Sequence, residues 1–98
     1  MGSSKERFKT RLIKYEIVFS ARAEKSIKAL PEKLQARIHG AIATLEGNPI
    51  PPVARKLVGR DTYRLRVSDY RIIYSIQKNI LTIEIVSVGH RSEVYRKN

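Results

Sequence analysis

The chain contains no cysteine, and this absence excludes several classes of protein. Disulfide frameworks, iron–sulfur clusters and thiolate zinc sites all require cysteine. Long apolar runs are also missing: no stretch approaches the roughly 20 residues that a membrane-spanning helix needs. The N-terminus lacks the apolar segment of a signal peptide. We therefore expect a cytoplasmic protein with no membrane partner.

Acidic residues and histidines are scarce as well. Nine Asp and Glu stand against 20 Lys and Arg, and the only histidines are His39 and His90. His39 lies among polar residues of an expected helix and is predicted to be exposed. Glycine-rich phosphate loops, paired carboxylates and a Ser-His-Asp arrangement are all absent. We therefore expect no metal, no other cofactor and no small-molecule ligand.

The chain is strongly basic. Its net charge of +11 and pI near 10.4 favour a polyanionic partner, because binding a phosphate backbone releases condensed counterions. The same charge also suits an anionic membrane surface or an acidic protein. With 98 residues, 42% of them apolar, the chain has the size and composition of one folded domain. Charge alone thus indicates a class of partner and no activity.

Two segments differ in composition. Residues 1–14 carry five basic side chains against Glu6, and we expect a solvated basic extension there, in which Gly2-Ser3-Ser4 is typical of vector-derived residues. Residues 15–98 contain the periodic apolar pattern of a domain. Its pattern predicts a compact β-α-α-β-β-β domain of the α+β class, with an N-terminal helical hairpin packed on a mostly antiparallel four-stranded sheet.

The expected elements follow from local signals. Residues 15–19 form a β-branched and aromatic run typical of a strand, and Ser20 can cap a helix over residues 21–30. Pro31 suits the first turn of a second helix to about residue 46, which Gly47 can end in a left-handed conformation. Residues 50–61 are expected to form a crossing loop. Strands are predicted at 63–67, 70–76 and 80–88, and the buried stripe of the second helix comprises Leu34, Ile38, Ile42 and Leu45.

The last third of the chain alternates cationic or aromatic side chains with apolar ones. Arg64 and Arg66 flank Leu65, so they share one face of a strand about 7 Å apart. A row of guanidinium groups on a rigid sheet suits RNA, whose ribose 2′-hydroxyl can itself attack the adjacent phosphate. An enzyme then needs mainly to hold the geometry, neutralise charge on the phosphoryl oxygens and move two protons. The alternative is that the arginines only solvate an exposed face, with Glu84 pairing one of them.

Several motifs in order resemble the RelE branch of the RelE/ParE toxin superfamily. The resemblance spans about residues 15–96. It is carried by the N-terminal strand Tyr15-Glu16-Ile17-Val18-Phe19-Ser20 followed by two helices, and by Lys56-Leu57-Val58-Gly59, Tyr63-Arg64-Leu65-Arg66-Val67, Asp69-Tyr70-Arg71-Ile72-Ile73-Tyr74 and Val88-Gly89-His90-Arg91 with Val94-Tyr95.

The resemblance implies a toxin of a toxin–antitoxin pair that cleaves messenger RNA in the A site of the 70S ribosome. It implies an antitoxin partner, which we expect to be acidic and RelB-like. Arg71 and Arg91 would bind the scissile phosphate, and Tyr95 would stack on or help activate the substrate. Arg64 and Arg66 fall on the paired basic positions of the family. We expect further RNA contacts from Arg55, Lys56, Arg60 and Arg96.

One departure from the family pattern affects the chemistry. Lysines often occupy the two paired positions, whereas this chain has Arg64 and Arg66, and guanidinium groups transfer protons poorly. Since imidazole is the side chain best suited to proton transfer near neutral pH, His90 is a candidate proton donor as well as a plain polar residue at a strand end. Two rival functions remain open: a ParE-like poison of DNA gyrase, and a non-catalytic RNA- or DNA-binding domain.

Overall fold

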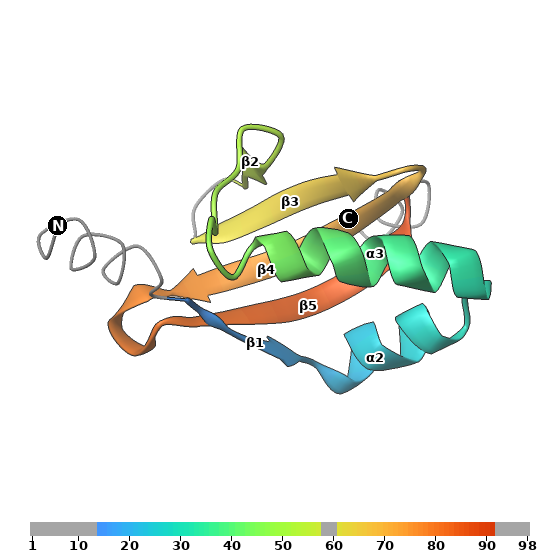
Figure 1. Ribbon diagram of the computed structural model, residues 1–98, viewed down its shortest axis with the longest axis horizontal. Coiled ribbons are helices and arrows are strands. Elements are labelled where there is room, and N and C mark those ends of the chain that lie inside the picture. Colours follow the sequence, from blue (N-terminus) through green and yellow to red (C-terminus); the bar gives the residue numbers. More distant parts are fainter. Residues whose placement is uncertain (1–13, 58–60, 92–98) are drawn as a thin grey trace, which may run out of the picture.

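The computed structural model describes residues 14–57 and 61–91, which form two helices packed on one face of a five-stranded sheet (Figure 1). The predicted basic extension over residues 1–14 lies outside this part except for Lys14. In chain order the elements are β1 (Glu16–Phe19), α2 (Ala21–Lys28), α3 (Glu32–Thr44), β2 (Arg55–Lys56), β3 (Thr62–Val67), β4 (Tyr70–Gln77), the 3-10 turn η1 (Lys78–Ile80) and β5 (Thr82–His90).

The sheet has the strand order β1-β5-β4-β3-β2. β1 runs parallel to β5, and every other neighbouring pair is antiparallel. The predicted α+β fold with a mostly antiparallel sheet is thus confirmed, but the predicted number of four strands is wrong. The fifth strand, β2, has only two residues and follows two prolines. It is too short to show the alternation by which a strand is recognised in a sequence.

Ser20 joins the first helix to the sheet. Its side-chain oxygen accepts a hydrogen bond from the backbone N–H of Ala23 at 3.0 Å, which confirms the predicted N-cap. The same hydroxyl donates to the carbonyl of Val86 in β5 at 2.7 Å. Val86 lies where the β4–β5 register shifts, so one hydroxyl fixes both the start of α2 and an irregularity of the central sheet.

The second helix ends differently from our prediction. Leu45, the C-cap, has right-handed backbone angles (φ −68°), and the φ of Gly47 is not in the left-handed region. The N–H groups of Leu45 and Glu46 bond to the carbonyls three residues earlier, at Ile42 and Ala43. Such tightened bonds satisfy the last carbonyls without a left-handed residue. The predicted glycine stop is therefore wrong.

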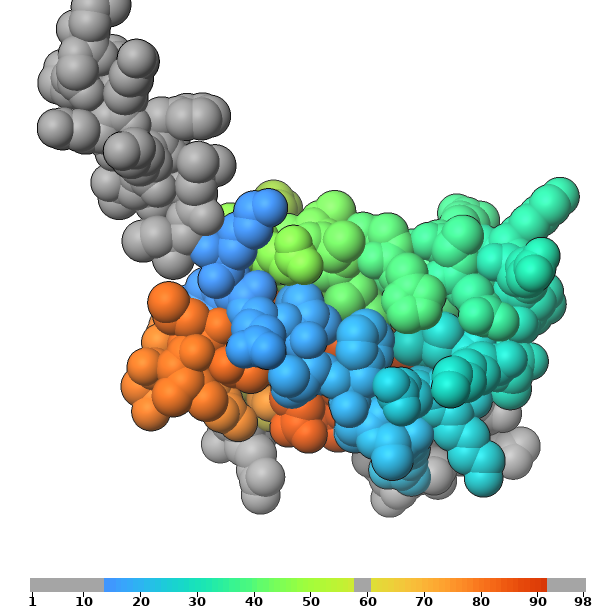
Figure 2. Space-filling view, turned by 60° about the horizontal axis from the view of Figure 1, so that its bottom comes forward, coloured from blue at the N-terminus to red at the C-terminus, as the bar shows by residue number. Residues whose placement is uncertain are grey.

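The core lies between the helices and the sheet. The predicted stripe of α3 is confirmed, since Ile38, Ile42 and Leu45 are buried and Leu34 packs against them. From the sheet, alternate residues of β3, β4 and β5 enter the same layer: Tyr63, Leu65, Ile72, Tyr74, Ile76, Ile83, Ile85 and Val88. In the space-filling view β1, α2 and α3 (blue to green) form one continuous surface over this layer (Figure 2). The other face of the sheet is left without a covering helix among the described residues.

None of the helices in the described part of the chain combines the length and the apolar character needed to cross a bilayer.

Candidate nucleic-acid interface

Four arginines from three adjacent strands share the face of the sheet that points away from the helices. Strand register sets this arrangement: Arg55 of β2 is opposite Arg64 of β3, and Arg66 of β3 is opposite Arg71 of β4. Leu65, between the two arginines of β3, is in the core, so its neighbours must point the other way. We call the surface formed by Arg55, Arg64, Arg66 and Arg71 the arginine face.

The four arginines differ in depth. Arg71 is only 4% exposed, whereas Arg55 and Arg66 are exposed. Arg71 lies opposite Arg66 on one side and Gly89, which has no side chain, on the other. The face therefore has a buried cation on β4, the middle strand of the whole sheet, and accessible cations along β2 and β3. A ligand can contact the outer guanidinium groups directly while the central charge contributes to the field beneath it.

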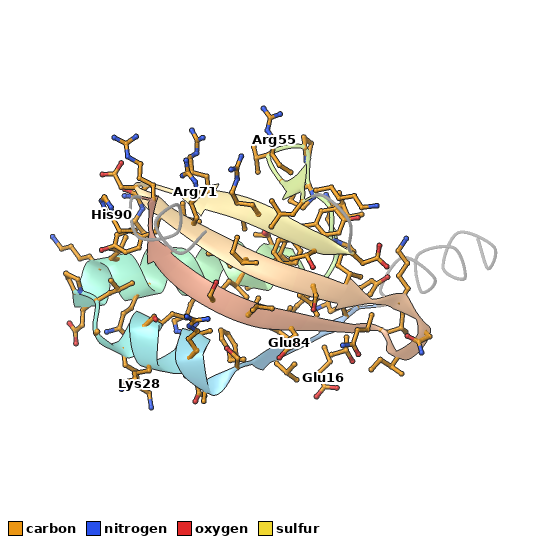
Figure 3. All side chains as sticks on the ribbon, turned by 180° about the vertical axis from the view of Figure 1, so that it is seen from behind. Glu16, Lys28, Arg55, Arg71, Glu84 and His90 are labelled. Atoms are coloured by element: carbon orange, nitrogen blue, oxygen red, sulfur yellow. The ribbon has the colours of Figure 1, made fainter. Side chains whose placement is uncertain are left out.

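Two carboxylates lie toward the opposite edge of the same sheet face. Glu16 of β1 and Glu84 of β5 lie at register positions next to Thr82 and Val18, two or more strands from β3. Viewed from behind, their side chains lie far from Arg55 and Arg71 (Figure 3). Within residues 14–57 and 61–91, no carboxylate forms an ion pair with Arg55, Arg64 or Arg66. The suggested pairing of Glu84 with one of these arginines is thus not found.

A hollow of about 390 Å³ adjoins the arginine face. It is lined by Arg55, Arg64 and Arg66, and by Pro52 and Val53 from the loop before β2. Sequence analysis included the three arginines but missed the two apolar residues. The proline-rich composition of residues 50–61 indicated a loop, and nothing in that pattern showed that the loop would fold back beside β3.

The loop that carries Pro52 and Val53 is held by a buried tyrosine. The hydroxyl of Tyr74 donates to the carbonyl of Pro49 at 2.7 Å, and the N–H of Ala54 donates to the carbonyl of Pro51 at 2.9 Å. The Tyr74 ring is fully buried and stacks on Tyr63, with ring centroids 5.7 Å apart. Desolvation by burial, with the nearby Tyr63 phenol, raises the pKa of Tyr74 to about 12. Tyr74 is therefore neutral and donating at physiological pH.

The remaining predicted site residues are not all brought to this face. Arg91 donates its backbone N–H to the carbonyl of Asp69 at 2.9 Å, which places it at the end of the sheet where Arg66 and Arg71 pair. His90 is opposite Tyr70 in the register, and their rings meet edge-on at 5.4 Å. Since Tyr70 packs against the core, His90 lies on the helix side of the sheet.

Lys56 is exposed and opposite the buried Tyr63, so it also lies on the helix side. The predicted residues Arg60, Tyr95 and Arg96 lie outside the described residues. His39 is exposed as predicted, with its ring 5.8 Å from that of Phe19. In the described part of the chain, no three His, Asp or Glu side chains are grouped in a way that could hold a metal ion.

Comparisons with known proteins agree with this fold. The family profile described as the ParE toxin of the type II toxin–antitoxin system parDE matches residues 17–95. Toxin RelG of Mycobacterium tuberculosis is 31% identical over 87 residues, which cover 85% of this chain and 98% of that protein. Toxin RelE of the same organism is 31% identical over 88 residues, covering 86% and 89%. The chain therefore belongs to the RelE/ParE superfamily and is a type II toxin of this family.

Solved structures show the same architecture. The toxin–antitoxin complex RelBE2 of M. tuberculosis contains a chain that superimposes with a TM-score of 0.71 at 27% identity, covering 81% of this chain and all of the other. The isolated Escherichia coli RelE toxin gives a TM-score of 0.70 at 27% identity, covering 85% and 93%. Related chains were crystallised with their RelB antitoxins, among them one from Pyrococcus horikoshii.

Proposed function

We propose that this toxin is a ribosome-dependent endonuclease that cleaves messenger RNA in the A site and so stops translation and growth. One observation carries the proposal: four arginines of β2, β3 and β4 share a sheet face, with Glu16 and Glu84 toward its other edge. Guanidinium groups match phosphate oxygens with paired donors and remain charged at any physiological pH. The names of the RelE and RelG relatives support the same assignment.

The chemistry proposed for this face needs no cofactor. The ribose 2′-oxygen attacks the neighbouring phosphorus, the bond from phosphorus to the 5′-oxygen breaks, and a 2′,3′-cyclic phosphate remains. Negative charge builds on the phosphoryl oxygens as this happens. Arg71 and Arg91 would stabilise that charge, and Arg64 and Arg66 would hold the chain on either side. Removing one such donor typically costs about 10²- to 10³-fold in rate.

Fewer residues are proposed to transfer protons than the sequence alone suggested. His90 is on the other side of the sheet from Arg66 and Arg71, so the proposal gives it no part in the reaction. Tyr95, outside the described residues, stays the predicted group that stacks on or activates the substrate. The arginines are poor acids and bases, and free RNA should accordingly be a poor substrate without the ribosome.

The proposed protein partner is an acidic, RelB-like antitoxin. Related toxins were crystallised with RelB antitoxins. A domain of net charge +11 attracts an acidic chain over a long range, which speeds association. Covering the arginine face would neutralise the toxin directly.

The test is primer extension on a translated reporter mRNA after brief induction of the toxin alone. We expect cuts within codons that require ribosomes and fall at least 100-fold with Arg91→Ala. Arg91 is exposed, so the variant should stay folded, which circular dichroism checks. Arg71→Ala should have the same effect, although Arg71 is buried and its folding needs the same check. Arg37→Ala removes the same charge from an exposed position of α3 and is the matched control.

A gyrase poison is the second candidate, because the matching family profile is that of ParE. Such a toxin would arrest growth with DNA breaks and intact mRNA, and Arg91→Ala would leave the growth arrest unaffected. Harmless expression with salt-sensitive RNA binding would instead indicate a non-catalytic binding domain. Either result would overturn the nuclease assignment.

A further inference from the structure

The hollow beside the arginine face combines two kinds of lining. Pro52 and Val53 form an apolar side, with Val53 67% exposed, and Arg55, Arg64 and Arg66 form a cationic side. An exposed apolar side chain beside three like charges stabilises nothing in the isolated domain. It does offer an apolar surface next to fixed hydrogen-bond donors for a phosphate group.

The residues that line the hollow are held in place by hydrogen bonds of the fold. β2 pairs with β3, so Arg55 is held in register with Arg64. The Tyr74 hydroxyl holds the carbonyl of Pro49, and the turn closed by Ala54 and Pro51 fixes the chain on both sides of Pro52 and Val53. Preorganised surfaces bind with a smaller loss of conformational entropy.

The chemistry of the hollow matches one nucleotide. Its volume of about 390 Å³ lies in the range of about 300–1,000 Å³ found for small-ligand sites. A base has flat apolar faces that can lie on Pro52 and Val53, and its phosphate can reach the forked donors of Arg55. Only two of the five lining residues are apolar, which is too few to anchor the apolar face of a peptide helix.

We propose that the hollow is the subsite for a nucleotide neighbouring the cleaved one, with its base on Pro52 and Val53 and its phosphate on Arg55. The proposal rests on the proposed nuclease function, since Arg64 and Arg66 line the hollow and belong to the arginine face. A nucleotide held there would be adjacent along the RNA strand to the part of the chain that Arg66 holds beside the scissile phosphate. The loop before β2 would then influence which sequences are cut.

Binding is tested apart from cleavage with a short RNA whose 2′-oxygens are removed, so that it cannot be cut. Methyl NMR spectra of the full chain should show Val53 shifting on titration while Ile80, exposed at the far tip of the β4–β5 hairpin, does not. Val53→Ser should weaken binding about threefold. Arg55→Ala should weaken it about tenfold, as expected for loss of one charge-assisted hydrogen bond. Ile80→Ser and Arg37→Ala are the matched controls.

The possible results of this experiment distinguish a failure of the proposed subsite from a failure of the proposed nuclease function. Shifts at Val53 with weaker binding by both variants support the subsite. Binding that perturbs the β3 and β4 strands but neither Val53 nor Arg55 overturns the subsite and leaves the nuclease assignment intact. A response at Val53 to an acidic peptide but not to RNA would show a protein-docking surface instead. No RNA response anywhere overturns the subsite, and the nuclease assignment is then decided by the primer-extension test on translated mRNA.

A second readout uses the translated mRNA. Val53→Ser should redistribute cuts among codons while total cleavage stays within about threefold of the parent toxin. Ile80→Ser should leave the distribution unchanged. An unchanged distribution for Val53→Ser would remove any role of the hollow in sequence preference.

Discussion

Tyr74 shows how a single buried residue links the core to the site. Its ring belongs to the core layer, and its hydroxyl holds the loop that lines the hollow. Its burial was predictable from the alternation of β4. Its partner was not, because Pro49 lies 25 residues earlier in a segment without periodicity.

The raised pKa of Tyr74 has a consequence for stability at high pH. Since the folded state holds the phenolic proton more tightly than the unfolded chain does, the stabilisation is complete below about pH 10. It is lost as the pH rises from about 10 through 12. Urea unfolding between pH 8 and pH 12 measures it.

Tyr74→Phe provides the control for that measurement. The variant should be less stable by about 1 kcal/mol at pH 8, because the Pro49 carbonyl loses its donor. The alkaline loss assigned to Tyr74 should then disappear. A parent and a variant that lose the same stability between pH 10 and pH 12 would contradict the assignment.

The β3–β4 hairpin is the element that brings Arg66 opposite Arg71. Its two-residue turn, Ser68-Asp69, fills the gap between the strands predicted at 63–67 and 70–76, and Val67 pairs with Tyr70 on either side of it. Ser68 has a φ of 57°, in the left-handed region that favours glycine. The pairing of two arginines across the hairpin also costs stability, since like charges face each other. The turn and the pair thus both store strain next to the site.

Ser68→Gly should relieve part of this strain. We expect the unfolding free energy to rise by about 0.5–1 kcal/mol, because glycine adopts positive φ without steric cost. Thermal or urea unfolding checks it. Ser75→Gly, in the extended β4, should instead lower stability by a similar amount. If both variants shifted stability in the same direction, the backbone explanation would fail.

At the scale of elements, the long strands and both helices were predictable because each has a regular apolar period. The ends of the elements and the pairing partners of the strands were less predictable. The end of α3 at Leu45 depends on backbone hydrogen bonds to the carbonyls of Ile42 and Ala43, which no particular residue type indicates. The side of the sheet on which His90 lies depends on its register with Tyr70 in the neighbouring strand, and the pattern within a single strand does not determine that register. The common face of Arg64 and Arg66 was predictable, because it follows from their spacing alone.

The whole molecule separates its charges across one sheet face. The guanidinium groups of β2, β3 and β4 lie at one edge, and Glu16 and Glu84 lie toward the other (Figure 3). Opposite charges kept apart neutralise each other little, so the arginine face keeps a positive field of its own.

Binding of single-stranded RNA should therefore weaken steeply with salt. If the three accessible arginines of the arginine face, Arg55, Arg64 and Arg66, each neutralise one phosphate, log K should fall with log salt at a slope of about −2. Fluorescence anisotropy from 50 to 300 mM salt measures it. Arg55→Ala should make the slope shallower by about 0.7, and Arg37→Ala should change it less. A slope near zero would exclude a phosphate-based interface.

The strand order also affects when the toxin can become active. β1 pairs only with β5 among the described strands, and the Ser20 bond to Val86 joins residues 66 positions apart. A chain growing from its N-terminus therefore makes its first strand long before the partner of that strand exists. Contacts of such long sequence separation form slowly and late. The arginine strands, too, need β5 beside β4. A nascent toxin would therefore remain without its complete sheet, and without a finished arginine face, until its final strand left the ribosome.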